Sequence, residues 1–298
     1  MIGRWVRYLA AAYRPSVQVP YTVTWALGLT AMFACLAGRV TEWRPDAQLA
    51  ITAATLVIVL LLIRPLDDIR DADYDRRANP HRPLPSGVVS ERDLLVLVAL
   101  GSVLVLLANA GRGVALAVLV VAMAYTGAVV ALERLAGWPR REQLVPQLVV
   151  NLPILAMLSL YVYAGFLRAE HLRPDAEGVL TVLAATAATL CPEFARKVTR
   201  RPKPGERSYV TVLGPSGTSL AALGAAVAAT AVVLALLGPW RPGYGWGWLL
   251  LAPLLLPVLA ALRFARGAPH WPLPHTMAYI PAMYTSFFAA GWLTKGTV

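Results

Sequence analysis

Charged residues are scarce in this chain of 298 residues: Asp, Glu, Lys and Arg make up only 14% of it, whereas 58% is hydrophobic. Soluble domains carry roughly 25% charged residues, so the composition excludes an ordinary soluble enzyme. The mean hydropathy of +0.59 and the repeated apolar runs of about 20 residues predict an all-α membrane protein that crosses the bilayer several times.

Cysteine is also rare. Only Cys35 and Cys191 occur, both within apolar segments, which excludes a disulfide framework and gives no spacing for a cysteine-bound metal. The formal net charge of +11 would suggest nucleic acid in a soluble protein, but no basic stretch is interleaved with aromatic residues. We therefore expect no nucleic-acid partner and assign the positive charge to a cytoplasmic membrane face in contact with lipid headgroups.

Nine apolar windows are long enough to span a bilayer. They lie at 20–38, 47–65, 93–110, 113–132, 144–166, 178–195, 216–238, 246–263 and 276–294. The connecting segments are short, which predicts one domain over residues 1–298 with nine transmembrane helices. Before the first window, residues 3–14 carry Arg4, Arg7 and Arg14 along one helical stripe, a pattern typical of a short helix in the membrane interface.

The basic residues predict the orientation of the chain in the membrane. If the N-terminus is cytoplasmic, the cytoplasmic segments hold 20 of the 27 Lys and Arg residues and the opposite side holds seven. Cytoplasmic loops carry an excess of Lys and Arg, so we expect an inside N-terminus. An odd number of spans then leaves the C-terminus outside.

The densest acidic stretch follows the second window. Five aspartates fall within nine positions, from Asp67 to Asp75. On a continuous helix Asp67, Asp71 and Asp75 stack on one face, with Asp68 beside them. Their mutual repulsion would become attraction around a divalent cation, and Mg²⁺ usually binds through one or two carboxylates together with substrate phosphate oxygens. The alternative is a solvated helix end neutralised by neighbouring arginines.

The stretch DDIRDADYDRRANPHRPLPSG, residues 67–87, resembles the first motif of the UbiA superfamily of intramembrane prenyltransferases. That motif reads N-D-x-x-D-x-x-x-D and is followed by R-P-[LI]-P-S-G. Asp67 stands where the family usually has Asn; Asp68, Asp71 and Asp75 take the acidic positions. The resemblance implies nine helices around a central cavity open sideways to lipid, Mg²⁺ as cofactor, an isoprenoid diphosphate as donor, and active-site caps after the second and sixth helices.

The second motif of that family, D-x-x-x-D, is expected after the sixth window. Here Glu193 can take the first acidic place, but Lys197 stands four residues on. This departure argues against a symmetric two-metal site and favours a mixed clamp, in which Lys197 and Arg200 hold diphosphate oxygens directly. A cytoplasmic excess of cations would also explain these basic residues. The expected metal ligands are the acids of both motifs: Asp67, Asp68, Asp71, Asp75 and Glu193.

Further candidates lie around this set. The catalytic side chains named by this interpretation are Asp68, Asp71, Asp75, Glu193 and Lys197, with Arg82 as an additional diphosphate ligand. Gln147 and Asn151, four residues apart in the fifth window, and Tyr161 are candidates for cavity lining. The alternative for these three is contact between packed helices.

The function expected from the sequence is Mg²⁺-dependent transfer of a prenyl group from an isoprenoid diphosphate to a small aromatic acceptor. The alternative is a terpene cyclase of the same superfamily, in which double bonds of the donor attack its own cation. A transporter would place charged or Gly/Pro-broken segments at mid-membrane, whereas the charges here cluster at one face. We expect a multi-pass protein of the cell membrane with its active-site loops on the cytoplasmic side.

Overall fold

The computed structural model describes residues 2–13, 15–140, 143–202, 208–241 and 244–296. Within these ranges the chain is helical and forms no strand, which confirms the predicted all-α fold. The elements are α1 (Ile2–Ala12), α2 (Pro15–Leu36), α3 (Ala47–Arg70), α4 (Ala72–Ala78), α5 (Glu91–Ala108), α6 (Val114–Ala136), α7 (Leu144–Ala169), α8 (Ala176–Ala188), α9 (Leu190–Ala195), α10 (Val210–Leu237), the 3₁₀ segment η1 (Gly245–Leu254), α11 (Leu255–Ala265) and α12 (Leu273–Lys295).

Each of the nine predicted windows coincides with a long helical segment, and two of these segments are pairs of consecutive helices, α8 with α9 and η1 with α11. Among the described residues, seven segments are long and apolar enough to cross a membrane. The remaining two are α5, which opens with the charged residues Glu91, Arg92 and Asp93, and α12, which carries polar residues along its length. Seven candidate spans are therefore supported, and nine stays a prediction.

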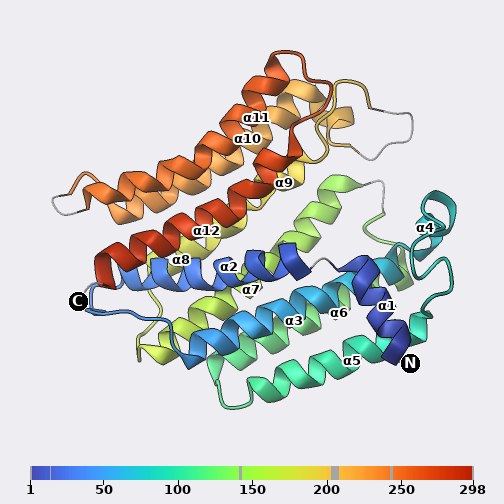
Figure 1. Ribbon diagram of the computed structural model, residues 1–298, viewed down its shortest axis with the longest axis horizontal. Coiled ribbons are helices and arrows are strands. Elements are labelled where there is room, and N and C mark those ends of the chain that lie inside the picture. Colours follow the sequence, from blue (N-terminus) through green and yellow to red (C-terminus); the bar gives the residue numbers. More distant parts are fainter. Residues whose placement is uncertain (1, 14, 141–142, 203–207, 242–243, 297–298) are drawn as a thin grey trace.

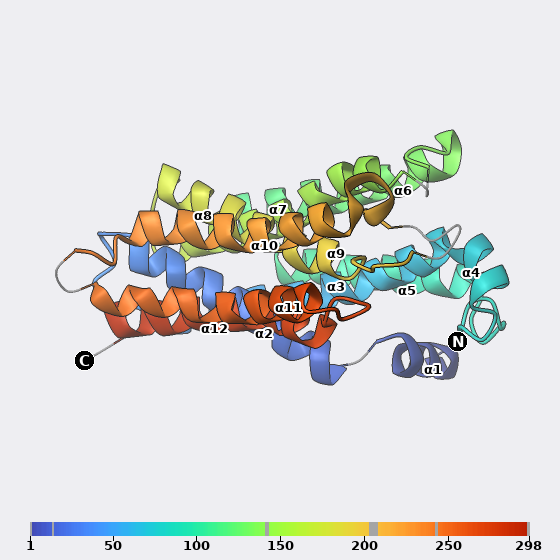
Figure 2. The same ribbon diagram turned by 90° about the horizontal axis from the view of Figure 1, so that it is seen from above.

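The long helices run side by side in one bundle (Figures 1 and 2). The N-terminus, α4, the start of α7 and the segment after α9 lie towards one end, and the C-terminus lies towards the other. The segments that carry most Lys and Arg residues thus meet at one end of the bundle. The side of the membrane that this end faces stays a prediction, as does the position of α1 in the interface.

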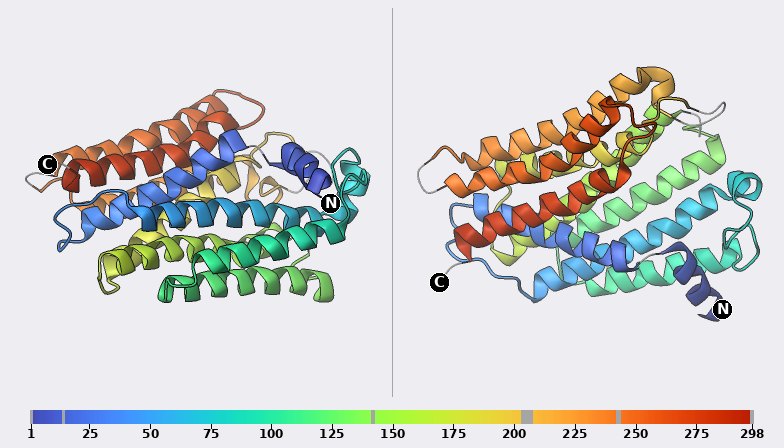
Figure 3. Two further views of the ribbon diagram at one scale, coloured as in Figure 1. Left: turned by 60° about the horizontal axis from the view of Figure 1, so that its bottom comes forward. Right: turned by 45° about the horizontal axis from the view of Figure 1, so that its top comes forward.

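The first and the last long helices, α2 and α12, lie against each other (Figure 3). A Cβ atom at Gly28 would lie 2.3 Å from the carbonyl oxygen of Tyr284, and one at Gly291 would lie 2.4 Å from that of Ala31. Small residues of this kind let membrane helices approach closely. The ring of Trp25 also stacks on that of Tyr284 at a centroid distance of 6.1 Å, so this contact closes the bundle.

A buried arginine in the connection between α5 and α6 joins several helices at the end of the bundle away from α4 (Figure 1). Arg112, which is 4% exposed, donates to the Asn109 side chain at 3.0 Å, to the Tyr161 hydroxyl at 2.6 Å and to the Thr52 hydroxyl at 2.8 Å. Its Nε has no hydrogen-bond partner among the described residues. Tyr161, a candidate for cavity lining from the sequence, belongs to this network and lies far from the acidic motif.

Candidate active site

A cavity of about 360 Å³ opens between α3, α6, α7, α9 and the residue before α10. One carboxylate of each motif lines it: Asp67 at the end of α3 and Glu193 in α9. Its other polar lining residues are Arg70, Thr126, Gln147, Asn151, Thr189, Arg196, Lys197 and Tyr209. Leucine, isoleucine and valine side chains form most of the remaining wall. The cavity therefore combines acids, cations and apolar surface.

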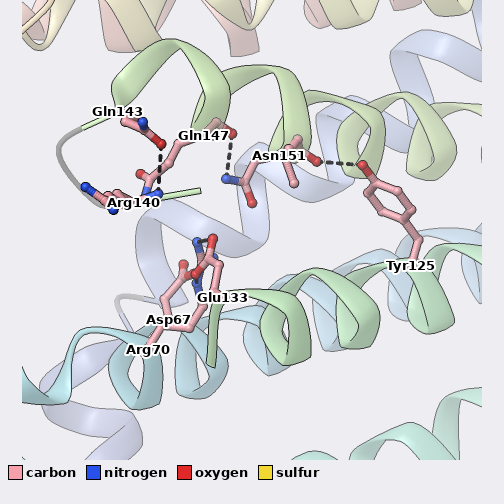
Figure 4. A network of polar contacts seen from close by, with 9 residues as sticks. Asp67, Arg70, Tyr125, Glu133, Arg140, Gln143, Gln147 and Asn151 are labelled. Carbon is pink, nitrogen blue, oxygen red and sulfur yellow. Dashed lines mark hydrogen bonds and ion pairs between the residues drawn. The ribbon is translucent and has the colours of Figure 1, made fainter. Parts of the chain in front are cut away.

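Arg70 is the most firmly held cation of this cavity. Its guanidinium donates to both carboxylate oxygens of Glu133 at 2.6 Å and to Oδ1 of Asp67 at 3.0 Å (Figure 4). The sequence interpretation did not name Arg70 or Glu133 as site residues. A signal for Glu133 was present, because an acid directly after an apolar run needs a partner.

Asp68 and Asp75 face other parts of the protein. Both oxygens of Asp68 are taken, Oδ2 by the Tyr8 hydroxyl at 2.8 Å and Oδ1 by the Arg64 guanidinium at 3.0 Å. Asp75 accepts from Asn79 and from Arg82, each at 2.7 Å. Both aspartates are buried, and neither they nor Arg82 line the cavity.

The predicted metal site on the stacked carboxylates stays a prediction, since Asp68 and Asp75 already have partners within the protein. Asp71 forms the junction between α3 and α4, with φ −89° and ψ 2°, and its side chain has contacts of its own. Backbone hydrogen bonds continue across this junction, from Asp71 to Asp67 and from Asp75 to Asp71, each 2.8 Å long. The helical register is thus as predicted, whereas the side chains of Asp67, Asp68 and Asp75 have different hydrogen-bond partners. Among the described residues, no group of three or more His, Cys, Asp or Glu could hold a metal ion.

In the second motif, Glu193 pairs with Arg196 and accepts from the Tyr209 hydroxyl at 3.1 Å. The Lys197 ammonium lies over the Tyr209 ring, 5.6 Å from its centroid. Burial and the nearby Glu193 carboxylate raise the pKa of the Tyr209 hydroxyl, so it stays a neutral donor. Lys197 and Tyr209 together form one wall of the cavity.

Arg200 is placed elsewhere. Its guanidinium donates to the backbone oxygens of Phe264 and Ala268 and lies over the Phe264 ring, 4.7 Å from the centroid. The expectation that Lys197 and Arg200 share a helical face is wrong, because α9 ends at Ala195. The chain beyond it pairs with the segment before α12, where Thr199 and His270 form a bridge. The cation of this motif that lines the cavity together with Lys197 is Arg196 instead.

A smaller, apolar chamber of about 160 Å³ adjoins the cavity. The two share four lining residues: Ile63, Leu66, Thr126 and Ile154. Ser102 and Thr126 are the polar residues of the chamber, and the Thr126 hydroxyl already donates to the backbone of Ala122 at 2.8 Å. The polar cavity thus lies next to an apolar one between α3, α5, α6 and α7.

The model of the UbiA prenyltransferase family matches residues 20–290. The chain belongs to this family. The fold agrees with the apo structure of a UbiA homolog from Aeropyrum pernix K1, with a TM-score of 0.60, 20% sequence identity, and coverage of 93% of this chain and 97% of the other. The comparison with curated proteins gives no match.

UbiA family members generally use a divalent metal with diphosphate substrates. Mg²⁺ is usually bound through one or two carboxylates, with waters and substrate phosphate oxygens completing its shell. Asp67 and Glu193 both line the cavity and supply two carboxylates of this kind. The residues present therefore fit a magnesium ion that arrives with a diphosphate.

Proposed function

We propose that the protein is a Mg²⁺-dependent intramembrane prenyltransferase that transfers a prenyl group from an isoprenoid diphosphate to a small aromatic acceptor. The observation that carries the proposal is the cavity itself. Carboxylates from both motifs and the cations Arg196 and Lys197 line a polar space, and an apolar chamber that shares four of its lining residues adjoins it. Such a shape suits a substrate with a strongly anionic head and a long hydrocarbon tail.

The head group binds at the polar end. Lys197 and Arg196 hold the diphosphate oxygens by charge-assisted hydrogen bonds. Asp67 and Glu193 would hold Mg²⁺, which when bound neutralises charge on the leaving group. Glu133 accepts from two N–H groups of Arg70, so Arg70 contacts Asp67 through one further N–H group. This contact holds one oxygen of the Asp67 carboxylate. The prenyl tail lies in the chamber, where water that would quench a cation is excluded.

The reaction begins with heterolysis of the bond between the first prenyl carbon and the diphosphate oxygen. The electron pair leaves with the diphosphate, and Lys197 and Arg196 stabilise the growing negative charge. A ring carbon of the acceptor attacks the allylic cation and then loses its proton. In the cyclase alternative, a double bond of the donor attacks instead.

The test uses the purified protein in lipid nanodiscs with Mg²⁺ and geranyl, farnesyl or geranylgeranyl diphosphate, with and without a panel of small phenols. Without a phenol we expect slow diphosphate release and simple prenyl alcohols; a suitable phenol should accelerate release and yield a prenylated product. Excess chelator should abolish release reversibly. Full activity in excess chelator overturns the magnesium requirement, and a cyclic hydrocarbon formed from the donor alone assigns the protein as a cyclase.

The structure and family describe an integral membrane protein. We propose that it resides in the cell membrane with the cavity end on the cytoplasmic side. The count of basic residues supports this orientation. Labelling of single cysteines introduced at Arg39 and at Arg201 in intact cells tests it: Arg39→Cys should react with an impermeant reagent and Arg201→Cys should not.

A further inference from the structure

The N-terminal helix α1 is fastened to the helices on either side of the first motif. The Trp5 indole donates to the backbone oxygen of Asp93 at 2.9 Å, and Arg4 pairs with the Asp93 carboxylate at 3.1 Å. Asp93 itself completes the capping box of α5 with Ser90. The third contact goes to the motif, where the Tyr8 hydroxyl donates to Asp68 at 2.8 Å. One face of α1 therefore docks on α5 and α3.

Tyr8 is fully buried, and its ring packs in a cluster with Ile69, Val89 and Leu94. Burial, followed by the charge of Asp68, raises the pKa of its hydroxyl, which therefore acts as a neutral donor. A phenylalanine would fill the same space, so packing alone does not require the hydroxyl. The hydroxyl instead occupies the oxygen of Asp68 that Arg64 leaves free.

The geometry of α3 links this contact to the cavity. Asp67 and Asp68 are neighbours in its last turn, and successive helical side chains point about 100° apart around the axis. Asp68 is held on the α1 side by Tyr8 and Arg64, while Asp67 lines the cavity. Fixing Asp68 therefore fixes the rotation of this turn about its axis, and with it the direction of Asp67.

We propose that Tyr8 is a positioning residue for the donor site: its hydrogen bond to Asp68 holds the last turn of α3 so that Asp67 points into the cavity. The helix α1 is then part of the active-site architecture. The expected effect of Tyr8 on the binding of metal and diphosphate rests on the proposed function. The expected effect of Tyr8 on the end of α3 does not depend on that function.

The test compares Tyr8→Phe with Tyr13→Phe in the full chain in lipid nanodiscs. Tyr13 is a matched control, because it is also buried and its hydroxyl has no hydrogen-bond partner among the described residues. The first readout is hydrogen–deuterium exchange of the backbone amides at the end of α3. Loss of one buried hydrogen bond should speed their exchange about tenfold in Tyr8→Phe, and Tyr13→Phe should match the wild type.

The second readout is the binding of Mn²⁺ in the presence of inorganic diphosphate, measured by electron paramagnetic resonance. Tyr8→Phe should bind Mn²⁺ about tenfold more weakly, and Tyr13→Phe within twofold of the wild type. Wild-type exchange at the end of α3 in Tyr8→Phe overturns the inference, and so do equal changes in both variants. If exchange changes as expected but the wild-type protein binds no Mn²⁺ with diphosphate, the proposed function fails and the positioning role of Tyr8 stands.

Discussion

The guanidinium of Arg70 donates two hydrogen bonds of 2.6 Å to Glu133 and only one, of 3.0 Å, to Asp67. The two carboxylates come from different helices, α6 and α3. A two-contact pair between a guanidinium and a carboxylate is the firmest that arginine forms. Glu133 therefore limits the contact of Arg70 with Asp67 to a single oxygen, Oδ1.

Glu133→Gln should consequently raise the Mg²⁺ concentration needed for half-maximal diphosphate release by about tenfold, which corresponds to ~1.4 kcal/mol. The amide cannot balance the charge of Arg70, so the guanidinium turns to Asp67 and competes with the ion. Glu91→Gln is the control, because Glu91 pairs with Arg134 and both side chains are 44% exposed; exposed pairs of this kind contribute little. A normal Mg²⁺ requirement in Glu133→Gln would show that the pair does not shape the site.

Lys197→Ala should raise the KM for the prenyl diphosphate by roughly 30-fold, because a hydrogen bond to a charged group contributes about 2 kcal/mol. Measured diphosphate release over a range of donor concentrations gives this value. Arg201→Ala serves as the control, since Arg201 is exposed and does not line the cavity. Lys203, a basic residue of the same segment, lies outside the described residues. An equal increase of KM in the two variants would show that Lys197 acts only through the general positive charge of this segment and does not bind the diphosphate itself.

Arg200→Ala should lower the thermal stability and leave donor binding nearly unchanged. Its guanidinium donates to the carbonyl oxygens of Phe264 at the end of α11 and of Ala268 just beyond it, so its removal breaks these hydrogen bonds and costs about 1–2 kcal/mol. Thermal unfolding in nanodiscs reports the stability, and the donor KM of Lys197→Ala gives the comparison. If Arg200→Ala raises the donor KM as much as Lys197→Ala does and leaves the unfolding temperature unchanged, Arg200 binds the diphosphate after all.

Gly127→Val should restrict the length of the prenyl donor. Gly127 is exposed and lines the apolar chamber, and an added Cβ would meet nothing within 4 Å, so a larger side chain can be placed there without a clash. The ratio of kcat/KM for geranylgeranyl over geranyl diphosphate should fall about tenfold, since one or two lost methylene contacts cost 1–3 kcal/mol. Gly224→Val in α10, where an added Cβ also meets nothing within 4 Å, should keep the wild-type ratio. An unchanged ratio in Gly127→Val would place the tail elsewhere.

The helices and the register of the motifs were predictable because they depend on local pattern. Apolar runs end at Asp67 and near Glu193, and both residues lie at helix ends beside one cavity. The hydrogen-bonded continuity from Asp67 through Asp71 to Asp75 also follows the predicted spacing. The residue types and their spacing were sufficient for these features.

The directions of the side chains were not predictable, because they depend on partners far away in the sequence. Asp68 turns to Tyr8, 60 residues earlier, and Arg200 turns to Phe264, 64 residues later. Asp75 is captured by Arg82, which belongs to the sequence tail of the same motif but folds back on it. A spacing rule assigns all these groups to one site, whereas in the folded chain Asp68, Asp75 and Arg200 each take partners outside the cavity.

The buried Arg112 imposes an order on the assembly of the helices in the membrane. Its acceptors belong to Thr52 in α3, Asn109 after α5 and Tyr161 in α7, so two consecutive helices supply only part of the network. A buried cation without acceptors costs several kcal/mol; Thr52 and Asn109 supply acceptors once α3 and α5 are together, and Tyr161 completes the set only when α7 joins them. The half of the chain that carries the first motif can thus close around Arg112 before the helices of the second motif have emerged from the ribosome.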